Sequence, residues 1–144
     1  MDILHKITRK VLLTVVGGTL YGANLRGANL RGADLLKCKG IAQTCVAPEC
    51  GSFTAWKKCA GGVIVKLRIP ASAKRSNATG RKCRAECAKV LRIYGATEAT
   101  SLHDLSVVYR VGETVKCHTW EPDRWIECGG GIHFFMTRQE AEEY

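Results

Sequence analysis

The stretch that most constrains the fold is residues 20–37, LYGANLRGANLRGADLLK. Within it a leucine recurs every five residues, at Leu20, Leu25, Leu30 and Leu35. An alanine stands two residues before each of the last three leucines, with asparagine or aspartate in between. A period of five fits neither the turn of an α-helix nor the alternation of a β-strand. The spacing therefore indicates an internal repeat.

This pattern resembles the pentapeptide-repeat family, whose motif is A(D/N)LXX. The resemblance implies a right-handed quadrilateral β-helix, in which the leucines point inward and four repeats form one coil. Residues 18–37 are enough for about one coil, and a single coil cannot bury its own stacking faces. We therefore expect the coil to pack on the rest of the chain or on another subunit, and we predict a homo-oligomer, most simply a dimer or tetramer.

The composition is that of an ordinary globular protein. The chain has 144 residues, of which 46% are hydrophobic and 24% charged, which predicts one domain or one small domain with an appendage. No apolar run is long enough for a membrane helix, and the first ten residues lack the pattern of a signal peptide. We expect a soluble, cytoplasmic protein with no membrane contact, in which the eight cysteines are reduced thiols.

Outside the repeat, the pattern predicts β-strands. The expected strands cover residues 7–16, 53–59, 63–69, 88–94, 105–111 and 114–120, with a short one at IHFFM, residues 132–136. Thr137 and Glu140 have the spacing of a capping box, which predicts a C-terminal helix. The predicted fold class is α+β and β-rich: a short pentapeptide-repeat coil joined to a small β-sheet domain with a C-terminal helix.

These elements divide the chain into four parts. The predicted parts are an N-terminal strand at 1–17, the repeat coil at 18–37, a turn-rich linker at 38–51 and a β-rich ligand-binding domain at 52–144. The last part is similar to an uncharacterised domain that follows pentapeptide repeats in proteins of bacteriophages and other large DNA viruses, through strings such as GSFTAWKKC, IPASAKRSNATGRKCRAECAKVL and ECGGGIHFF. That resemblance implies a viral origin and the cytoplasm of an infected host cell, and it implies no particular activity.

The formal net charge of +9 is unevenly placed. Residues 51–95 carry a net charge of +10, whereas residues 96–144 carry −5. The densest basic segment is 74–84, KRSNATGRKCR, predicted to lie in a polar loop at 71–82 and the residues that follow it. Guanidinium groups bind phosphate through a bidentate fork, and Lys acts as a point charge. The segment therefore favours an anionic ligand, although a solvated basic face is the simpler alternative.

We predict a phosphate-bearing nucleotide in this basic segment, with an aromatic side chain stacking on its base. The predicted ligand-binding residues are Lys74, Arg75, Arg81, Lys82, Arg84, Tyr109 and Trp125. If the basic segment is only a solvated face, the site is to be sought among the aromatic residues of 109–134.

The motifs of metal sites and enzymes are missing. The cysteines form no CxxC pair, so we predict neither a metal site nor a cofactor. No nucleophile elbow, metalloprotease motif or P-loop is present. Cys128 lies close to His133 in sequence, and the cations around Cys83 favour a lowered pKa for its thiol. No complete catalytic set results, and we predict a protein that is not an enzyme.

Three classes of function remain. The first is a non-enzymatic phage-type protein that sequesters a small nucleotide, a candidate sponge for cyclic-nucleotide or ADP-ribose-derived host immune signals. The second is a nucleic-acid-binding module, in which the basic block contacts phosphates. The third is a protein-interaction module that presents the basic loop to an acidic host partner.

Overall fold

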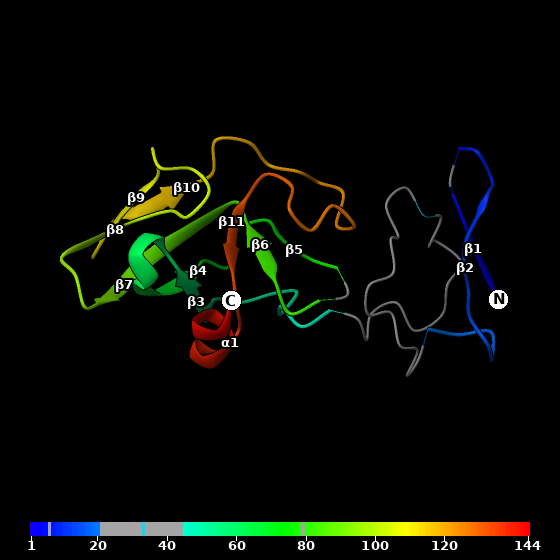
Figure 1. Cartoon of the computed structure of the whole chain (residues 1–144), viewed down its shortest axis with the longest axis horizontal. Helices are drawn as coiled ribbons and strands as arrows, with labels where there is room; N and C mark the ends of the chain where they lie inside the picture. Colours follow the sequence, from blue (N-terminus) through cyan, green and yellow to red (C-terminus); the bar gives the residue numbers. More distant parts are fainter. Residues whose placement is uncertain (6, 21–32, 34–44, 79) are drawn as a thin grey trace.

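The computed structural model describes residues 1–5, 7–20, 33, 45–78 and 80–144. The chain is β-rich (Figure 1). Its strands are β1 (Asp2–Leu4), β2 (Val11–Thr14), β3 (Phe53–Lys58), β4 (Ile64–Ile69), β5 (Arg75–Asn77), β6 (Cys83–Ala85), β7 (Cys87–Tyr94), β8 (Glu98–Thr100), β9 (Val108–Arg110), β10 (Thr114–Lys116) and β11 (Ile132–Phe134). One helix, α1 (Arg138–Glu143), follows them, and a 3₁₀ turn spans Ala60–Gly62.

Two sheets enclose the main core. The larger has the order β10-β7-β4-β3 and the smaller the order β11-β6-β5, with antiparallel pairing throughout. They meet twice: only Glu86 separates β6 from β7, and Trp56 of β3 exchanges two main-chain hydrogen bonds with Phe135, just after β11. One long segment of chain thus enters both sheets, as strands do at the corners of packed sheets.

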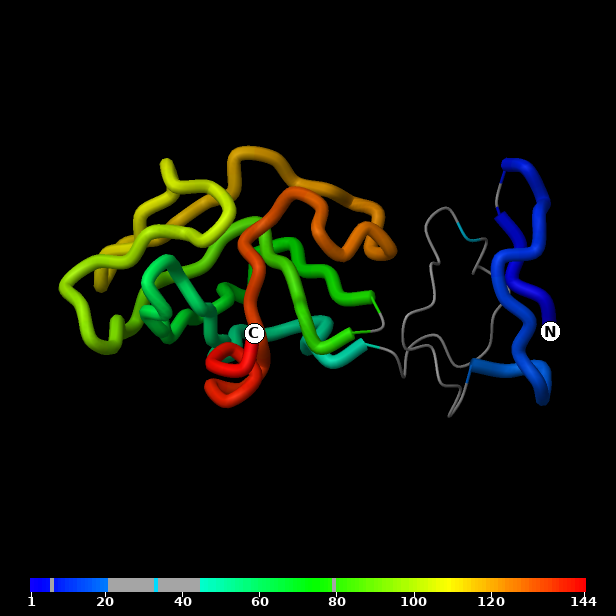
Figure 2. The backbone as a smooth tube through the Cα atoms, in the orientation of Figure 1, coloured from blue at the N-terminus to red at the C-terminus, as the bar shows by residue number. Residues whose placement is uncertain are grey.

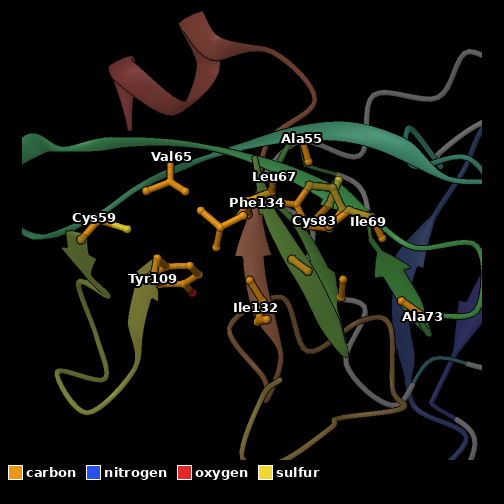
Figure 3. Close-up of a cluster of buried hydrophobic side chains, with 14 of the residues drawn as sticks. Ala55, Cys59, Val65, Leu67, Ile69, Ala73, Cys83, Tyr109, Ile132 and Phe134 are labelled. Atoms are coloured by element: carbon orange, nitrogen blue, oxygen red, sulfur yellow. The ribbon is translucent and has the colours of Figure 1, made fainter. Parts of the chain in front are cut away.

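The core side chains come from the alternating positions of these strands. Figure 3 shows Tyr109 lying among Cys59, Val65 and Ile132, all of which are almost completely buried. The β8–β9 hairpin supplies Tyr109 and Ala99 to this cluster. On the other face of β3 and β4, α1 packs through Ala141.

The C-terminal helix begins as the sequence predicts. The Thr137 hydroxyl accepts a hydrogen bond from the main-chain N–H of Glu140, and the Glu140 carboxylate accepts one from the N–H of Thr137. This reciprocal capping box satisfies two N–H groups that would otherwise lack partners in the first turn.

The single strand predicted for residues 7–16 is correct only over β2, Val11–Thr14. Residues 1–15 instead form the β1–β2 hairpin, closed by main-chain hydrogen bonds between Met1 and Val15. The turn forms because the His5 Nδ1 accepts hydrogen bonds from the N–H groups of Ile7 and Thr8, and Arg9 adopts a positive φ of 58°. The imidazole thus accepts hydrogen bonds from two N–H groups, which in a continuous strand would donate to a neighbouring strand.

The predicted basic loop also contains regular structure. β5 lies within the expected loop at 71–82, and it pairs with β6, which the sequence analysis does not predict. Both strands have only three residues, too few to show an alternation. β8 is likewise missed, and the strands expected at 105–111 and 114–120 are shorter, since β9 is Val108–Arg110 and β10 ends at Lys116.

The predicted pentapeptide coil at 18–37 falls almost entirely on residues outside the described ones, as does most of the linker at 38–51. Among the described residues, no helix is long and apolar enough to cross a membrane.

Candidate functional site

A pocket of about 210 Å³ opens where four parts of the chain converge. These parts are β3, the β8–β9 hairpin with its loop, the end of β10, and the return of the chain into β11 (Figure 1). The lining carries an unusual number of ionisable side chains: Lys57, His103, Asp104, Tyr109, Lys116, Cys117, His118, Cys128 and His133. Pockets for whole drug-sized ligands are about 300–1,000 Å³, so this one suits a single compact group.

Lys57 projects from β3 into the interior of the domain. It stands opposite Val65 in the sheet, and Val65 pairs in turn with Ile93, both of them core residues. The lysine is only 6% exposed, and its Nζ donates to the carbonyl of His133 at 3.3 Å. Burial lowers its pKa, while Cys59 opposes this effect and the Lys82 ammonium adds to it. No carboxylate forms an ion pair with Lys57 among the residues that the structure describes.

His133 in β11 and Tyr109 in β9 form the inner wall of the pocket. Burial, reinforced by the positive charge of Lys82 and Lys57, lowers the pKa of His133 to about 4, so its imidazole is neutral at physiological pH. Its Nε2 atom is buried without a hydrogen-bond partner. The Tyr109 ring lies 5.8 Å from the Lys57 Nζ, and burial raises the pKa of its phenol.

The rim of the pocket carries an ion pair. The Asp104 Oδ2 lies 3.1 Å from the Nδ1 of His118. Hydrogen bonds from the hydroxyl and the N–H of Ser106 are the main reason that the pKa of Asp104 lies below its ordinary value. Lys116 is exposed beside them. The rim is therefore polar and exposed to solvent, whereas Lys57 and Tyr109 of the inner wall are buried.

The remaining wall is the segment 117–131, a long excursion between β10 and β11 (Figure 2). Its glycines let the chain fold closely on itself. A Cβ on Gly130 would lie 2.6 Å from the carbonyl oxygen of Thr119, and Gly131 has a φ of 144°. Any side chain at Gly130 would push the two passes of this segment apart and deform the pocket.

Arg84 fixes the same segment from behind. Its guanidinium donates to the carbonyls of Glu121, Asp123 and Gly130 and to the hydroxyl of Ser76, and it is only 2% exposed. Burial is the main cause that lowers its pKa, yet an arginine stays protonated in proteins. The predicted phosphate ligand Arg84 thus has its donors directed at the protein's own main chain.

Arg75 is similarly engaged. All five of its N–H groups donate to main-chain carbonyls, those of Pro48, Gly51, Pro70, Ala71 and Ala73. Its guanidinium also lies over the Phe53 ring at 5.3 Å. This arrangement fastens residues 48–51 to the sheet domain.

The other three predicted cations do not line the pocket, although Lys82 reaches one of its lining residues, Cys128. Arg81 forms an ion pair with Glu140 of α1, and Lys74 lies 3.6 Å from Glu86. The Lys82 Nζ donates to the Tyr144 hydroxyl at 2.6 Å and lies 3.8 Å from the Cys128 sulfur. Arg81 and Lys82 share the C-terminal side of the domain, but the five cations do not converge on one point.

The two predicted aromatic residues separate as well. Tyr109 lines the pocket, but at 1% exposure its ring offers little face to a base. Trp125 packs with its ring against the N-terminal cluster of Ile3, Val15 and Leu20. Among the described residues, the pocket that contains Tyr109 includes no residue of the basic segment, and the ligand contacts predicted for all seven residues stay predictions.

Two buried cysteines, Cys59 and Cys83, do not have the lowered pKa of activated thiols. Burial raises the pKa of Cys83 to about 12 and that of Cys59 to about 11. The lowered pKa expected for Cys83 is therefore wrong, because desolvation outweighs the nearby Arg81. Within the described residues, no group of three or more His, Cys, Asp or Glu side chains is placed to bind a metal ion.

Sequence analysis did not select Lys57, although a signal is present. Phe53, Ala55, Lys57 and Cys59 occupy alternate positions, so one lysine stands in an otherwise apolar row. A cation on the apolar face of a strand departs from the pattern that burial favours. The sequence contains no such signal for Lys116 and His118. Their position at the same pocket depends on the path of residues 117–131.

The fold and the pocket define the class of protein: a small β-rich domain preceded by a pentapeptide-repeat segment. Residues 17–39 match the model described as Pentapeptide repeats (8 copies). Residues 43–141 match the model described as a family of unknown function, DUF5758, and the chain belongs to this family. No curated protein and no solved structure matches the chain.

Proposed function

We propose that the chain binds a small phosphate-bearing ligand without transforming it, with a phosphate seated against Lys57. The observation that carries the proposal is an inward-facing lysine with no carboxylate partner among the described residues, at the wall of an open pocket. An uncompensated ammonium is costly to bury, and an anionic ligand offsets that cost. Residues with shifted pKa values in a cleft are typical of functional sites.

The rest of the pocket suits an anion. Lys116 adds a second positive charge at the rim, and the buried Nε2 of His133 offers an unused polar atom at the wall. The glycines at 129–131 expose main chain that a phosphate oxygen can approach closely. With about 210 Å³ available, the pocket admits a phosphate and a part of what it is attached to, and leaves the rest of a nucleotide at the rim.

The proposed biological role is sequestration. The resemblance of residues 50–144 to domains in phage and other viral proteins supports a protein that acts in an infected cell, against a cyclic-nucleotide or ADP-ribose-derived host signal. No enzyme family matches the chain, which is consistent with binding alone. The homo-oligomer predicted from the single coil belongs to the same proposal.

Isothermal titration calorimetry with inorganic phosphate, ADP-ribose derivatives and cyclic dinucleotides tests the ligand class. The substitution Lys57→Met removes the charge and keeps an unbranched side chain of similar length. Because a charge-assisted contact is worth about 1.5–3 kcal/mol, the substitution should weaken binding by about ten- to a hundredfold. Lys58→Met is the matched control, since the neighbouring lysine points to the opposite face of β3 and donates to the carbonyl of Glu142.

Two results would contradict the pocket assignment. One is a parent protein that binds none of these compounds. The other is a bound ligand whose affinity is unchanged by Lys57→Met. If Arg81→Ala weakens binding in that case, the sequence-based site is favoured over the pocket.

A further inference from the structure

The four-stranded sheet presents a second basic feature on its outward face, opposite to Lys57. None of its strands contains an aspartate or glutamate. Four cations stand at outward positions of the two central strands, Lys66 and Arg68 in β4, and Lys89 and Arg92 in β7. We call these four residues the basic face.

The pairing within the basic face is unfavourable by itself. Lys66 stands directly opposite Arg92, and Arg68 directly opposite Lys89. Like charges in directly opposed positions destabilise a sheet. Their neighbours on the outer strands are uncharged: Trp56 and Thr54 on β3, and Thr114 on β10.

The basic face lacks the ion pairs that several other cations of the domain form. Elsewhere Lys74, Arg81, Arg110 and Arg138 each form an ion pair with a glutamate. Among the described residues no acidic side chain pairs with any member of the basic face. Four neighbouring cations thus lie together on this face without an acidic partner among the described residues.

Two aromatic rings position half of the basic face. The Lys66 Nζ lies 5.4 Å from the centre of the Trp56 ring, and the Arg92 guanidinium lies 4.9 Å from that of Tyr94. The two rings are themselves neighbours, with centres 5.9 Å apart. Cations resting on aromatic rings lose less freedom when they meet a ligand. The rings are themselves held in place, because both pack against the cluster of Ile64, Phe135 and Ala141.

We propose that this face binds single-stranded nucleic acid through its sugar–phosphate backbone. Neighbouring strands lie about 5 Å apart and alternate residues about 7 Å apart along a strand, which is the spacing of Lys66 and Arg68. Lys89 and Arg92 are three residues apart because the pairing shifts register between Lys66 and Leu67, and the four cations form two facing pairs suited to successive phosphates. A sheet with basic and aromatic side chains is a platform for single strands. A membrane surface would favour several apolar side chains among the cations, whereas the directly paired positions on the outer strands hold two threonines and one tryptophan, Thr54, Thr114 and Trp56.

The proposal does not depend on the pocket, and the experiment separates the two. Fluorescence anisotropy with a labelled oligothymidylate about twelve nucleotides long should show binding that weakens with salt. With four phosphate contacts the logarithmic salt slope is about −2.8, so affinity falls about 50-fold between about 50 and 200 mM salt. Arg68→Gln combined with Lys89→Gln should lower the slope to about −1.4 and this loss to about sevenfold.

The matched control is Lys10→Gln combined with Arg110→Gln, which removes the same charge from two exposed positions outside the basic face. This control should keep the parent's salt slope. Far-ultraviolet circular dichroism confirms that each variant is folded.

Three outcomes would overturn the proposal. One is a parent protein that does not bind the oligomer at about 50 mM salt. Another is an equal loss in both double variants, which would attribute binding to net charge alone. The third is displacement of the oligomer by polyglutamate of equal charge, which would reassign the face to an acidic protein.

Discussion

Lys57, Arg75 and Arg84 show how differently this fold accommodates cations in its interior. Arg75 directs five N–H groups at main-chain carbonyls, and Arg84 directs its terminal nitrogens at three carbonyls and a hydroxyl. Lys57 has one such hydrogen bond, to His133. The planar arginine fork can satisfy several carbonyls at once, and this explains why two predicted ligand residues stabilise loops. Under the proposed function, the remaining donors of the lysine would meet the ligand.

His133 should make the domain sensitive to mild acid. Its pKa of about 4 in the folded state lies below the ordinary 6.5, so the folded state binds fewer protons than the unfolded state between these values. Stability therefore falls as the pH drops from 6.5 to 4 and loses nothing further from this group below 4. After allowance for solvent screening the loss is on the order of 2 kcal/mol.

Urea unfolding of the parent and of His133→Phe across this pH range measures the effect. The variant should lose most of the pH dependence, whereas His103→Phe, at an exposed position, should keep it. The shifted carboxylates of Asp104 and Glu140 titrate at lower pH, since both pKa values are lowered. Equal pH slopes for the parent and His133→Phe would refute the prediction.

At the scale of elements, the pairing of β4 with β7 combines apolar and like-charged contacts. The inward residues Val65, Leu67 and Val90 are fully buried and hold the strands in register. The outward pairs oppose this pairing, because each places two cations side by side. Burial of the inner face outweighs the repulsion on the outer face.

Removing one of these charges should stabilise the sheet. Lys89→Thr leaves Arg68 without a like-charged partner and introduces a residue that favours strands. We expect the free energy of unfolding to rise by about 0.2–1 kcal/mol at low salt, with a smaller gain at high salt because exposed charges are screened.

Urea titration at two salt concentrations measures this gain. Arg110→Thr serves as the comparison, since it breaks an ion pair with Glu98 and should give no gain. A destabilised Lys89→Thr would show that the lysine stem contributes packing that exceeds the repulsion.

At the scale of the whole molecule, the sheet domain has a core of its own. The described residues of the main core cluster all lie between Val46 and Met136. The N-terminal cluster of Ile3, Val15 and Leu20 reaches the sheet domain through Trp125. The unit that matches DUF5758 and the unit with its own core are nearly the same stretch.

A fragment of residues 45–144 should therefore fold alone. We expect one cooperative thermal transition and a loss of no more than about 2 kcal/mol, the order of the apolar contact that Trp125 gives up. Calorimetry of the fragment and the full chain measures this. Absence of a cooperative transition in the fragment would show that the N-terminal 44 residues complete the core.

The local pattern of the sequence determined the β3–β4 hairpin, the position of β7 and the capping box at Thr137. It did so because alternation and capping depend on neighbours a few residues away. The same pattern identified the repeats at 20–37, and the family match agrees with it.

Only the tertiary structure decided what each cation does. Arg84 and Lys57 are both basic residues next to apolar ones in the sequence, yet one meets the carbonyls of residues 121–130 and the other meets an open pocket. Those partners lie roughly 40 and 75 residues away along the chain, and their approach depends on how the two sheets join and on the glycines that fold residues 117–131. The charge and spacing of residues in the sequence do not indicate such distant contacts, because the energy of a buried charge depends on the groups that surround it in space.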